Sequence, residues 1–139
     1  GRDNARTPMQ WNDEAEAGFT TGQPWLAVNP NYKEINVEAA LADPDSIFYT
    51  YQALIALRKD HPWLVTADYE LVDAADKVFA YKRVEGEQAY LVVVNLSSQE
   101  QELPLVNGVE EVLIANTKVE QVLESGKLAP WDAFCVKLA

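Results

Sequence analysis

The chain has 139 residues, of which 48% are hydrophobic and four are tryptophan, so its composition is that of a globular protein and not of a disordered one. Its 22 acidic residues outnumber 11 basic ones and give a formal net charge of −11. Because this charge repels phosphate groups, we expect neither nucleic acid nor a membrane surface as a partner.

The first eleven residues, GRDNARTPMQW, show neither helical nor strand periodicity and concentrate polar chemistry. Arg2 and Arg6 carry planar guanidinium groups, whose donors suit carboxylates, phosphates or the adjacent hydroxyls of a sugar. Pro8 keeps Thr7 out of the helical region and so extends the loop. The pattern is typical of a loop that contacts a polar ligand. The alternative is an arginine pair that ties the loop to neighbouring acidic side chains.

Residues 12–34 are predicted to be a long loop, because glycines and prolines interrupt every candidate element. A loop of this length is unusual in a compact domain unless it is functional or covers another part of the protein. Its large apolar residues would otherwise face water, so we expect it to pack on protein outside this chain. These residues are Phe19, Trp25, Leu26, Val28 and Tyr32.

Residues 35–42 favour a short helix, and the strongest helical pattern follows over residues 45–58. Asp43 is the predicted N-cap of this main helix, with Pro44 at its first position. Apolar residues at spacings of one, three and four form one broad stripe, which indicates a packed face more than a sugar-stacking patch. Pro62 restricts His61 and is expected to end the helix.

From Trp63 onward the composition changes to short apolar runs separated by turn residues, which predicts an antiparallel β-sandwich. The expected strands cover residues 69–72, 78–84, 88–96, 103–105, 109–115 and 134–138. The run over 89–94 is apolar on both faces and should be central, while Pro104 places its strand at an edge. Residues 119–128 are ambiguous, with a strand and a turn at Ser125-Gly126 as one interpretation.

Motifs that would identify a phosphate loop, a metal cluster or a serine nucleophile are absent from the sequence, so we predict no cofactor and no metal ligand among these residues, while Ca²⁺ binding by the rest of a longer protein stays open. Asp13, Glu14 and Glu16 lie in a polar run and are interpreted as a solvated turn and not as a catalytic pair. The single cysteine, Cys135, lies in an apolar strand and is interpreted as a packed thiol, which favours a cytoplasmic location. Asn95 begins a glycosylation sequon but should be too buried to be modified.

The run from Arg2 to Trp11 resembles the segment after the eighth barrel strand in the α-amylase superfamily, glycoside hydrolase family 13. Its likeness is greatest to the oligo-1,6-glucosidase and dextran-glucosidase (glucan 1,6-α-glucosidase) branch. The similarity continues through residues 17–22, 28–32 and 35–37 into the helix over 45–58. From residue 63 the resemblance is one of pattern, a series of short strands like the C-terminal β-domain of that family.

The resemblance implies a mostly β chain with one main helix. Residues 1–62 would be the tail of a (β/α)8 catalytic barrel, comprising the loop after strand eight and the closing helix, and residues 63–139 the C-terminal β-sandwich domain. The chain lacks an initiator methionine and begins inside the motif, so we expect it to be the C-terminal part of a longer protein. Its main partner would then be the rest of the barrel.

The resemblance also implies an exo-acting, retaining α-glucosidase that hydrolyses α-1,6 bonds of isomalto-oligosaccharides. The catalytic carboxylates of the family match no position here, so this chain alone should be inactive. The family's arginine at the place of Arg2 pairs with an aspartate and hydrogen-bonds the non-reducing-end glucose, so Arg2 is the predicted substrate-binding residue. Arg6 and Gln10 would hold the loop's shape, and Asn12 replaces the aspartate of the family.

Two other functions stay open on this sequence. Trehalose-6-phosphate hydrolases carry nearly the same motif within the same superfamily, and sucrose isomerases resemble it more remotely. A freestanding structural or carbohydrate-binding β-module is the alternative from another class. For the last of these, surface aromatic residues in line on one sheet face would favour binding.

Overall fold

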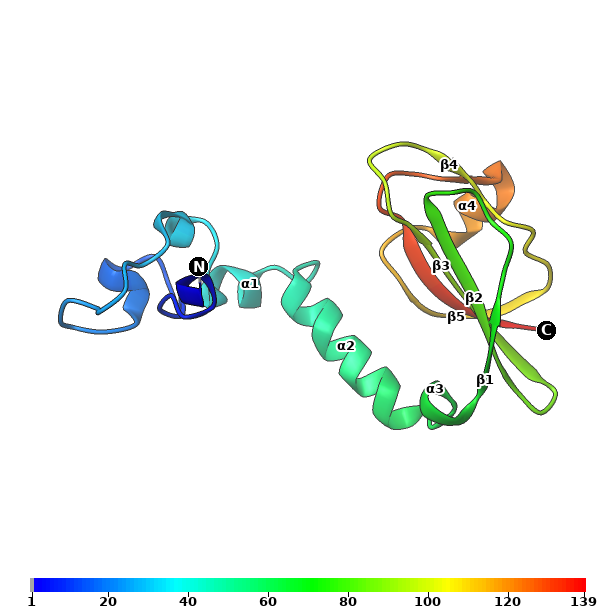
Figure 1. Ribbon diagram of the computed structural model, residues 1–139, viewed down its shortest axis with the longest axis horizontal. Coiled ribbons are helices and arrows are strands. Elements are labelled where there is room, and N and C mark those ends of the chain that lie inside the picture. Colours follow the sequence, from blue (N-terminus) through cyan, green and yellow to red (C-terminus); the bar gives the residue numbers. More distant parts are fainter. Residues whose placement is uncertain (1) are drawn as a thin grey trace. The chain divides into compact units, whose positions relative to one another are not determined.

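The structure is a computed structural model that describes residues 2–139, except for the side chain of Arg2. The chain forms two compact units, Gly1–Ala53 and Leu54–Ala139 (Figure 1). The first unit contains loops, short helical turns and the beginning of the main helix, and the second contains the end of that helix, the β-strands and two short helices. Within residues 2–139, no helix is long and apolar enough to cross a membrane.

The first unit contains little regular structure, as predicted for residues 12–34. Three 3₁₀ turns interrupt its loops: η1 (Arg2–Ala5), η2 (Ala15–Gly18) and η3 (Pro30–Lys33). The predicted short helix over 35–42 is confirmed as α1 (Val37–Ala42). Its N-cap is Asn36, whose Oδ1 accepts a hydrogen bond of 2.8 Å from Ala39 N.

The main helix, α2 (Ile47–Asp60), begins later than the sequence indicated. Asp43 ends α1 instead of capping α2, and its Oδ1 accepts from Asp45 N at 3.0 Å in a local turn. The predicted N-cap at Asp43 is therefore wrong, because the aspartate closes the turn between two helices. Pro62 follows the helix end as expected, and no residue of α2 is buried.

The second unit is organised around a five-stranded antiparallel sheet with strand order β1-β2-β3-β7-β5. Its strands are β1 (Asp68–Leu71), β2 (Val78–Glu85), β3 (Gln88–Asn95), β5 (Val109–Ala115) and β7 (Ala133–Leu138). The predicted central strand is confirmed, since β3 pairs with both β2 and β7. The β2–β3 hairpin turns at Gly86, whose φ of +63° suits a residue without a side chain.

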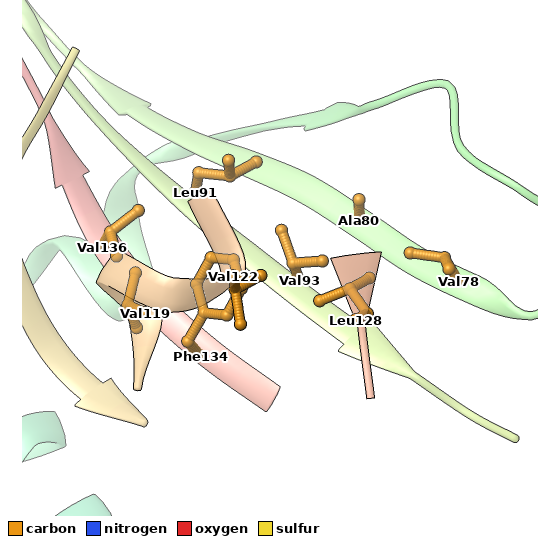
Figure 2. Packing of buried hydrophobic residues seen from close by; sticks show 9 residues of the cluster. All are labelled: Val78, Ala80, Leu91, Val93, Val119, Val122, Leu128, Phe134 and Val136. Atoms are coloured by element: carbon orange, nitrogen blue, oxygen red, sulfur yellow. The ribbon is translucent and has the colours of Figure 1, made fainter. Parts of the chain in front are cut away.

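A small second layer covers one face of this sheet and encloses the main core. It consists of β4 (Gln101–Glu102), β6 (Lys127–Leu128) and the helix α4 (Val119–Ser125). Val119 and Val122 of α4 lie beside Phe134 of β7 (Figure 2). The predicted β-sandwich is therefore confirmed as a β-rich fold whose second layer is only two strands and a helix.

One local prediction in this region is wrong, and one ambiguous segment is resolved. Residues 103–105 form no strand, and the pairing instead involves Gln101 and Glu102. The ambiguous segment 119–128 forms the helix α4 followed by the short strand β6, because Val119 and Val122 lie one turn apart and both pack on the sheet. Gly126 ends this helix in the left-handed conformation, so the predicted turn position is confirmed.

The other face of the sheet is partly covered by α3 (Trp63–Thr66). The ring of Trp63 stacks on that of Tyr90, with centroids 3.7 Å apart and planes at 7°. Trp63 is only 4% exposed and forms a second core with Cys135 and Ala67. The second unit thus has an apolar core on each side of its central strands.

Asn95 connects two loops at the end of β3 and is fully buried, with 0% exposure. Its Nδ2 donates to the carbonyls of Gln99 at 2.8 Å and Ala129 at 2.9 Å. Its Oδ1 accepts from Ser97 N at 3.0 Å. The expectation that the sequon asparagine is inaccessible is therefore confirmed, and the residue has a structural role.

Candidate functional site

The candidate site is the polar loop that begins the chain, residues 2–11. Arg2 begins the turn η1, but its side chain lies outside the described part of the structure. Arg6 follows the same turn, with its backbone N donating to Asp3 O at 3.0 Å, and its side chain is exposed. Within the described residues Arg6 makes no salt bridge, so the structure shows no acidic partner that ties Arg6 down.

The end of this loop is anchored on the first turn of α1. The carbonyls of Gln10 and Trp11 accept hydrogen bonds from Val37 N at 2.9 Å and from Glu38 N at 3.0 Å. These amides are among the donors that a helix N-terminus leaves without intrahelical partners. The side-chain amide of Gln10 also donates to the carbonyl of Ile35, so Gln10 holds the loop's shape, as predicted.

A left-handed turn at residues 16–18 also holds the end of the loop, through hydrogen bonds to the Ala17 carbonyl. Glu16 and Ala17 have φ of +52° and +55°, and Gly18 follows with +64°. For a residue with a side chain this conformation costs on the order of 1–2 kcal/mol. The carbonyl of Ala17, which is 0% exposed, accepts from Trp11 N at 2.9 Å. The contact between this turn and the loop offsets part of the strain.

Asn12 lies against this turn, at the position where the resemblance implies an aspartate. Its Oδ1 accepts from Glu14 N at 3.1 Å, a hydrogen bond that an aspartate could also accept. A side chain at Gly18 would place its Cβ 2.5 Å from Asn12 Oδ1. An asparagine at position 12 is therefore compatible with the loop, and its side chain leaves no room for a Cβ at position 18.

The residues interpreted as a solvated turn are mainly at the surface. Asp13 and Glu14 are exposed, and Glu16 is half-buried. Among residues 2–139, no group of three His, Cys, Asp or Glu side chains could hold a metal ion. Burial raises the pKa of the Cys135 thiol to about 11, so at neutral pH it is protonated and a poor nucleophile.

Large apolar side chains are exposed throughout the first unit and on α2. Trp25 is 91% exposed and Ile47 is 84% exposed, while Trp11 and Phe19 are each about half exposed. Of the apolar loop residues expected to need a covering surface, Leu26, Val28 and Tyr32 are half-buried within the unit. An exposed apolar area of this kind marks a surface that packs against protein or ligand.

Aromatic residues also lie in line on the part of the sheet that α3 leaves uncovered. Tyr81 of β2 lies between Tyr69 and Phe79, with ring centroids 5.2 and 5.3 Å away respectively. Leu71, which is exposed, pairs with Tyr81 across β1 and β2. The neighbours of the row on this face are mainly aliphatic, and the Arg83 guanidinium beside it donates to Ala67 O at 2.5 Å.

The sequence analysis missed two features of the site, and only the first of them had a signal in the sequence. Asn36 directly precedes a helical pattern, and this N-cap signal could have been recognised from the sequence. The left-handed conformation of Glu16 and Ala17 had no such signal beyond the neighbouring glycine. It depends on hydrogen bonds from Trp11 and Asn12, earlier in the chain.

Comparison with known families divides the chain into two matched regions. The sequence profile described as Alpha amylase, catalytic domain, matches residues 1–67. The profile described as Alpha-amylase SusG C-terminal domain matches residues 78–132.

Individual proteins match over nearly the whole chain. The glucan 1,6-alpha-glucosidase of Streptococcus pneumoniae is 64% identical over 99% of the chain, and the oligo-1,6-glucosidase of Parageobacillus thermoglucosidasius is 46% identical over 99%. The crystal structure of Bacillus licheniformis trehalose-6-phosphate hydrolase superposes with a TM-score of 0.85 at 41% identity, over 100% of the chain. In all three cases the chain spans 26% of the matched protein.

Proposed function

Because the chain belongs to the α-amylase family, glycoside hydrolase family 13, we propose that it is the C-terminal part of an exo-acting, retaining α-glucosidase acting on α-1,6 bonds of isomalto-oligosaccharides. The observation that carries this proposal is the 64% identity to a glucan 1,6-alpha-glucosidase over 99% of the chain. Because the chain spans 26% of that relative, the activity is proposed for the whole protein. By itself the chain would be inactive, since the catalytic carboxylates match none of its positions.

We assign residues 1–62 to the tail of the catalytic barrel and residues 63–139 to a C-terminal β-domain. The catalytic-domain profile covers residues 1–67 and the C-terminal-domain profile starts at residue 78. Trp63, directly after Pro62, packs in the core of the β-sheet unit. The exposed apolar residues of α2 and of the preceding loop support a partner surface, which in this proposal is the remainder of the barrel.

Arg2 is the proposed substrate-binding residue. A guanidinium has donors in a fixed planar arrangement, which can bind two neighbouring sugar hydroxyls and a carboxylate at the same time. The loop that carries it is held at Gln10 and Trp11 by the amides of α1. A donor on a fixed loop positions the non-reducing-end glucose at low entropic cost.

Replacing Arg2 tests this role in the full-length protein. We expect Arg2→Ala to lower kcat/KM for isomaltose by about 100-fold, the size typical for loss of a positioned donor. Arg2→Lys keeps the charge without the planar donor set and should recover only part of the loss. Arg58→Ala, at an exposed position in the last turn of α2, is the matched control and should leave kcat/KM unchanged. Equal rates for Arg2→Ala and the unaltered protein would exclude the assignment.

Trehalose-6-phosphate hydrolase is the second candidate, because the solved structure of such an enzyme covers the whole chain at 41% identity. Both candidates require a retaining pair of carboxylates in the rest of the protein. Assaying the full-length protein on isomaltotriose and on trehalose 6-phosphate separates them. We expect hydrolysis of isomaltotriose, and turnover of trehalose 6-phosphate alone would decide for the second candidate.

The aromatic row of Tyr69, Phe79 and Tyr81 is the observation that favours a carbohydrate-binding module. We assign the row instead to packing against the catalytic domain, because its neighbours are mainly aliphatic and offer few partners for sugar hydroxyls. Calorimetry of residues 63–139 with isomalto-oligosaccharides tests this choice. We expect no heat above dilution, and saturable binding would support the module.

We infer a cytoplasmic location for the whole protein. The support is chemical: Cys135 is a free, buried thiol that pairs with no other cysteine of this chain. Reduced thiols are the usual state of cysteine in a reducing compartment. Fractionation of the producing cells, with activity recovered in the lysate and not in the medium, would check this inference.

A further inference from the structure

The loop that leads into the edge strand β5 contains the pair Asn107-Gly108. Asn107 is the only asparagine of the sequence that a glycine follows. Both residues are exposed, while Leu103 and Val106 of the same loop pack against the main core. Gly108 has a φ of +65°, a conformation that a residue without a side chain adopts at little cost. The asparagine side chain thus lies at the surface, beside a backbone amide that no side chain shields.

The two groups that can react with each other at this turn are free of hydrogen bonds. Within the part of the chain that the structure describes, no hydrogen bond involves the Asn107 side chain or Gly108 N. By contrast, Asn116 Nδ2 donates to Trp131 O at 2.9 Å, and its Oδ1 accepts from Ala133 N at 2.7 Å. The Asn107 side chain can therefore rotate toward the backbone, whereas the fold fixes that of Asn116.

An asparagine side chain that is free next to glycine closes a five-membered ring with the following backbone amide. Gly108 N attacks Asn107 Cγ, the Cγ–Nδ2 bond breaks, and ammonia leaves with the hydrogen of Gly108 N. A side chain at position 108 would crowd this attack, and glycine has none. Water then opens the succinimide ring at Cγ, which gives aspartate, or at the main-chain carbonyl carbon of residue 107, which gives isoaspartate. Water is the only co-reactant.

We propose that Asn107 is a site of spontaneous deamidation in the folded protein, and that isoaspartate formed there loosens the start of β5. Gly108 O accepts a hydrogen bond from Ala139 N at 2.5 Å. The next residue, Val109, pairs with Leu138 of β7. In isoaspartate the main chain runs through Cβ and Cγ, so one atom is added to the backbone beside this hydrogen bond. The lengthened backbone displaces Gly108 O from Ala139 N.

The surfaces that the proposed function uses lie elsewhere in the β-sheet unit. Strands β1 and β5 are the two edges of the sheet. The aromatic row of Tyr69, Phe79 and Tyr81, which packs against the catalytic domain in the proposed function, lies on β1 and β2. That contact leaves the loop before β5 open to water. Deamidation at Asn107 requires neither substrate nor the catalytic carboxylates, so its test is independent of the proposed function.

Incubation of the full-length protein at mildly alkaline pH, followed by peptide mapping with mass spectrometry, tests the site. Labelling by a methyltransferase specific for isoaspartyl groups identifies that product. We expect Asn107 to lose its amide at least about tenfold faster than Asn116, a difference of about 1.4 kcal/mol in the barrier. A free peptide of residues 103–111 gives the unhindered rate, and Asn107 in the folded protein should react within about tenfold of it.

Two variants separate the rearranged backbone from the added charge. Asn107→Gln keeps the amide but would have to close a larger ring, so isoaspartate should be absent at position 107. Asn107→Glu carries the negative charge and should keep the exchange protection of the Ala139 amide, which the isoaspartyl protein should lose. Equal rates at Asn107 and Asn116, or loss of the Asn107 amide only after unfolding in urea, would overturn the proposed site. Isoaspartate that leaves the Ala139 amide fully protected would overturn its effect on β5.

Discussion

Replacing Asn95 should strongly destabilise the β-sheet unit, although the residue lies far in sequence from the candidate site. Its side chain makes four hydrogen bonds of 2.8 to 3.0 Å, in which Nδ2 donates to Gln99 O and Ala129 O and Oδ1 accepts from Ser97 N and Ser97 Oγ. Asn95→Ala removes all four and leaves two carbonyls, one amide and one hydroxyl without this partner. At about 1 kcal/mol per hydrogen bond, and more for a group left buried and unpaired, the expected loss of unfolding free energy is roughly 3–5 kcal/mol.

Asn95→Asp probes the direction of these hydrogen bonds without changing the shape of the side chain. It places a carboxylate oxygen against the two carbonyls, where the amide donated. The folded state then favours the protonated carboxyl, so its folded pKa lies above the unfolded value of about 3.9. The stability deficit against the unaltered chain is therefore largest at neutral pH and becomes smaller as the pH falls through the folded pKa.

Urea denaturation of the 139-residue chain, with hydrogen exchange of β3 amides as the local probe, measures both variants. Ser98→Ala is the matched control, since Ser98 is exposed beside the same loop and should change stability by less than about 0.5 kcal/mol. A loss of less than about 1 kcal/mol in Asn95→Ala would refute the reasoning, because it would show that solvent or loop movement satisfies the carbonyls.

Three further predictions concern single residues. Gly18→Ala should destabilise the first unit by more than about 2 kcal/mol, because the Cβ of the alanine would lie 2.5 Å from Asn12 Oδ1. Hydrogen exchange would show this destabilisation as a loss of protection of the Ala17 amide. Asn36→Ala removes the N-cap of α1 and should cost about 1 kcal/mol, measured as lower protection of Ala39 N. Burial raises the pKa of the Cys135 thiol from 9.0 in the unfolded chain to about 11 in the folded one, so the protonated thiol contributes to stability. This contribution is fully present below pH 9.0 and is lost as the pH rises to about 11. Cys135→Ala should reduce that alkaline loss in urea titrations, and an unchanged pH profile would contradict this.

Part of the fold could be predicted because the relevant signals are local. The β2–β3 hairpin follows from two apolar runs around Gly86, and the central place of β3 follows from apolar residues on both of its faces. Residues 119–128 could not be assigned because a short apolar run suits a helix or a strand equally. Packing on the sheet selected the helix, since Val119 and Val122 then face the same core.

The candidate site, too, could be predicted from the sequence only in part. The concentration of arginine, amide and indole groups in residues 2–11 was visible in the sequence, and so was the similarity to the α-amylase family. The anchoring of Gln10 and Trp11 by the amides of Val37 and Glu38 was not, because these residues are separated by 27 positions in each pair. Residue types alone contain no information on which distant amides a loop carbonyl will meet.

By itself, the sequence determined the alternation of strands, the end of the main helix and the family. The strands and the helix end depend on side-chain types within a few neighbouring positions, and the family depends on matching residues along the first 58 positions. The tertiary structure alone decided the small second layer over the sheet and the left-handed turn at Glu16 and Ala17. A residue with a side chain adopts a positive φ only where contacts from elsewhere in the fold compensate for the strain, and those contacts exist only after folding.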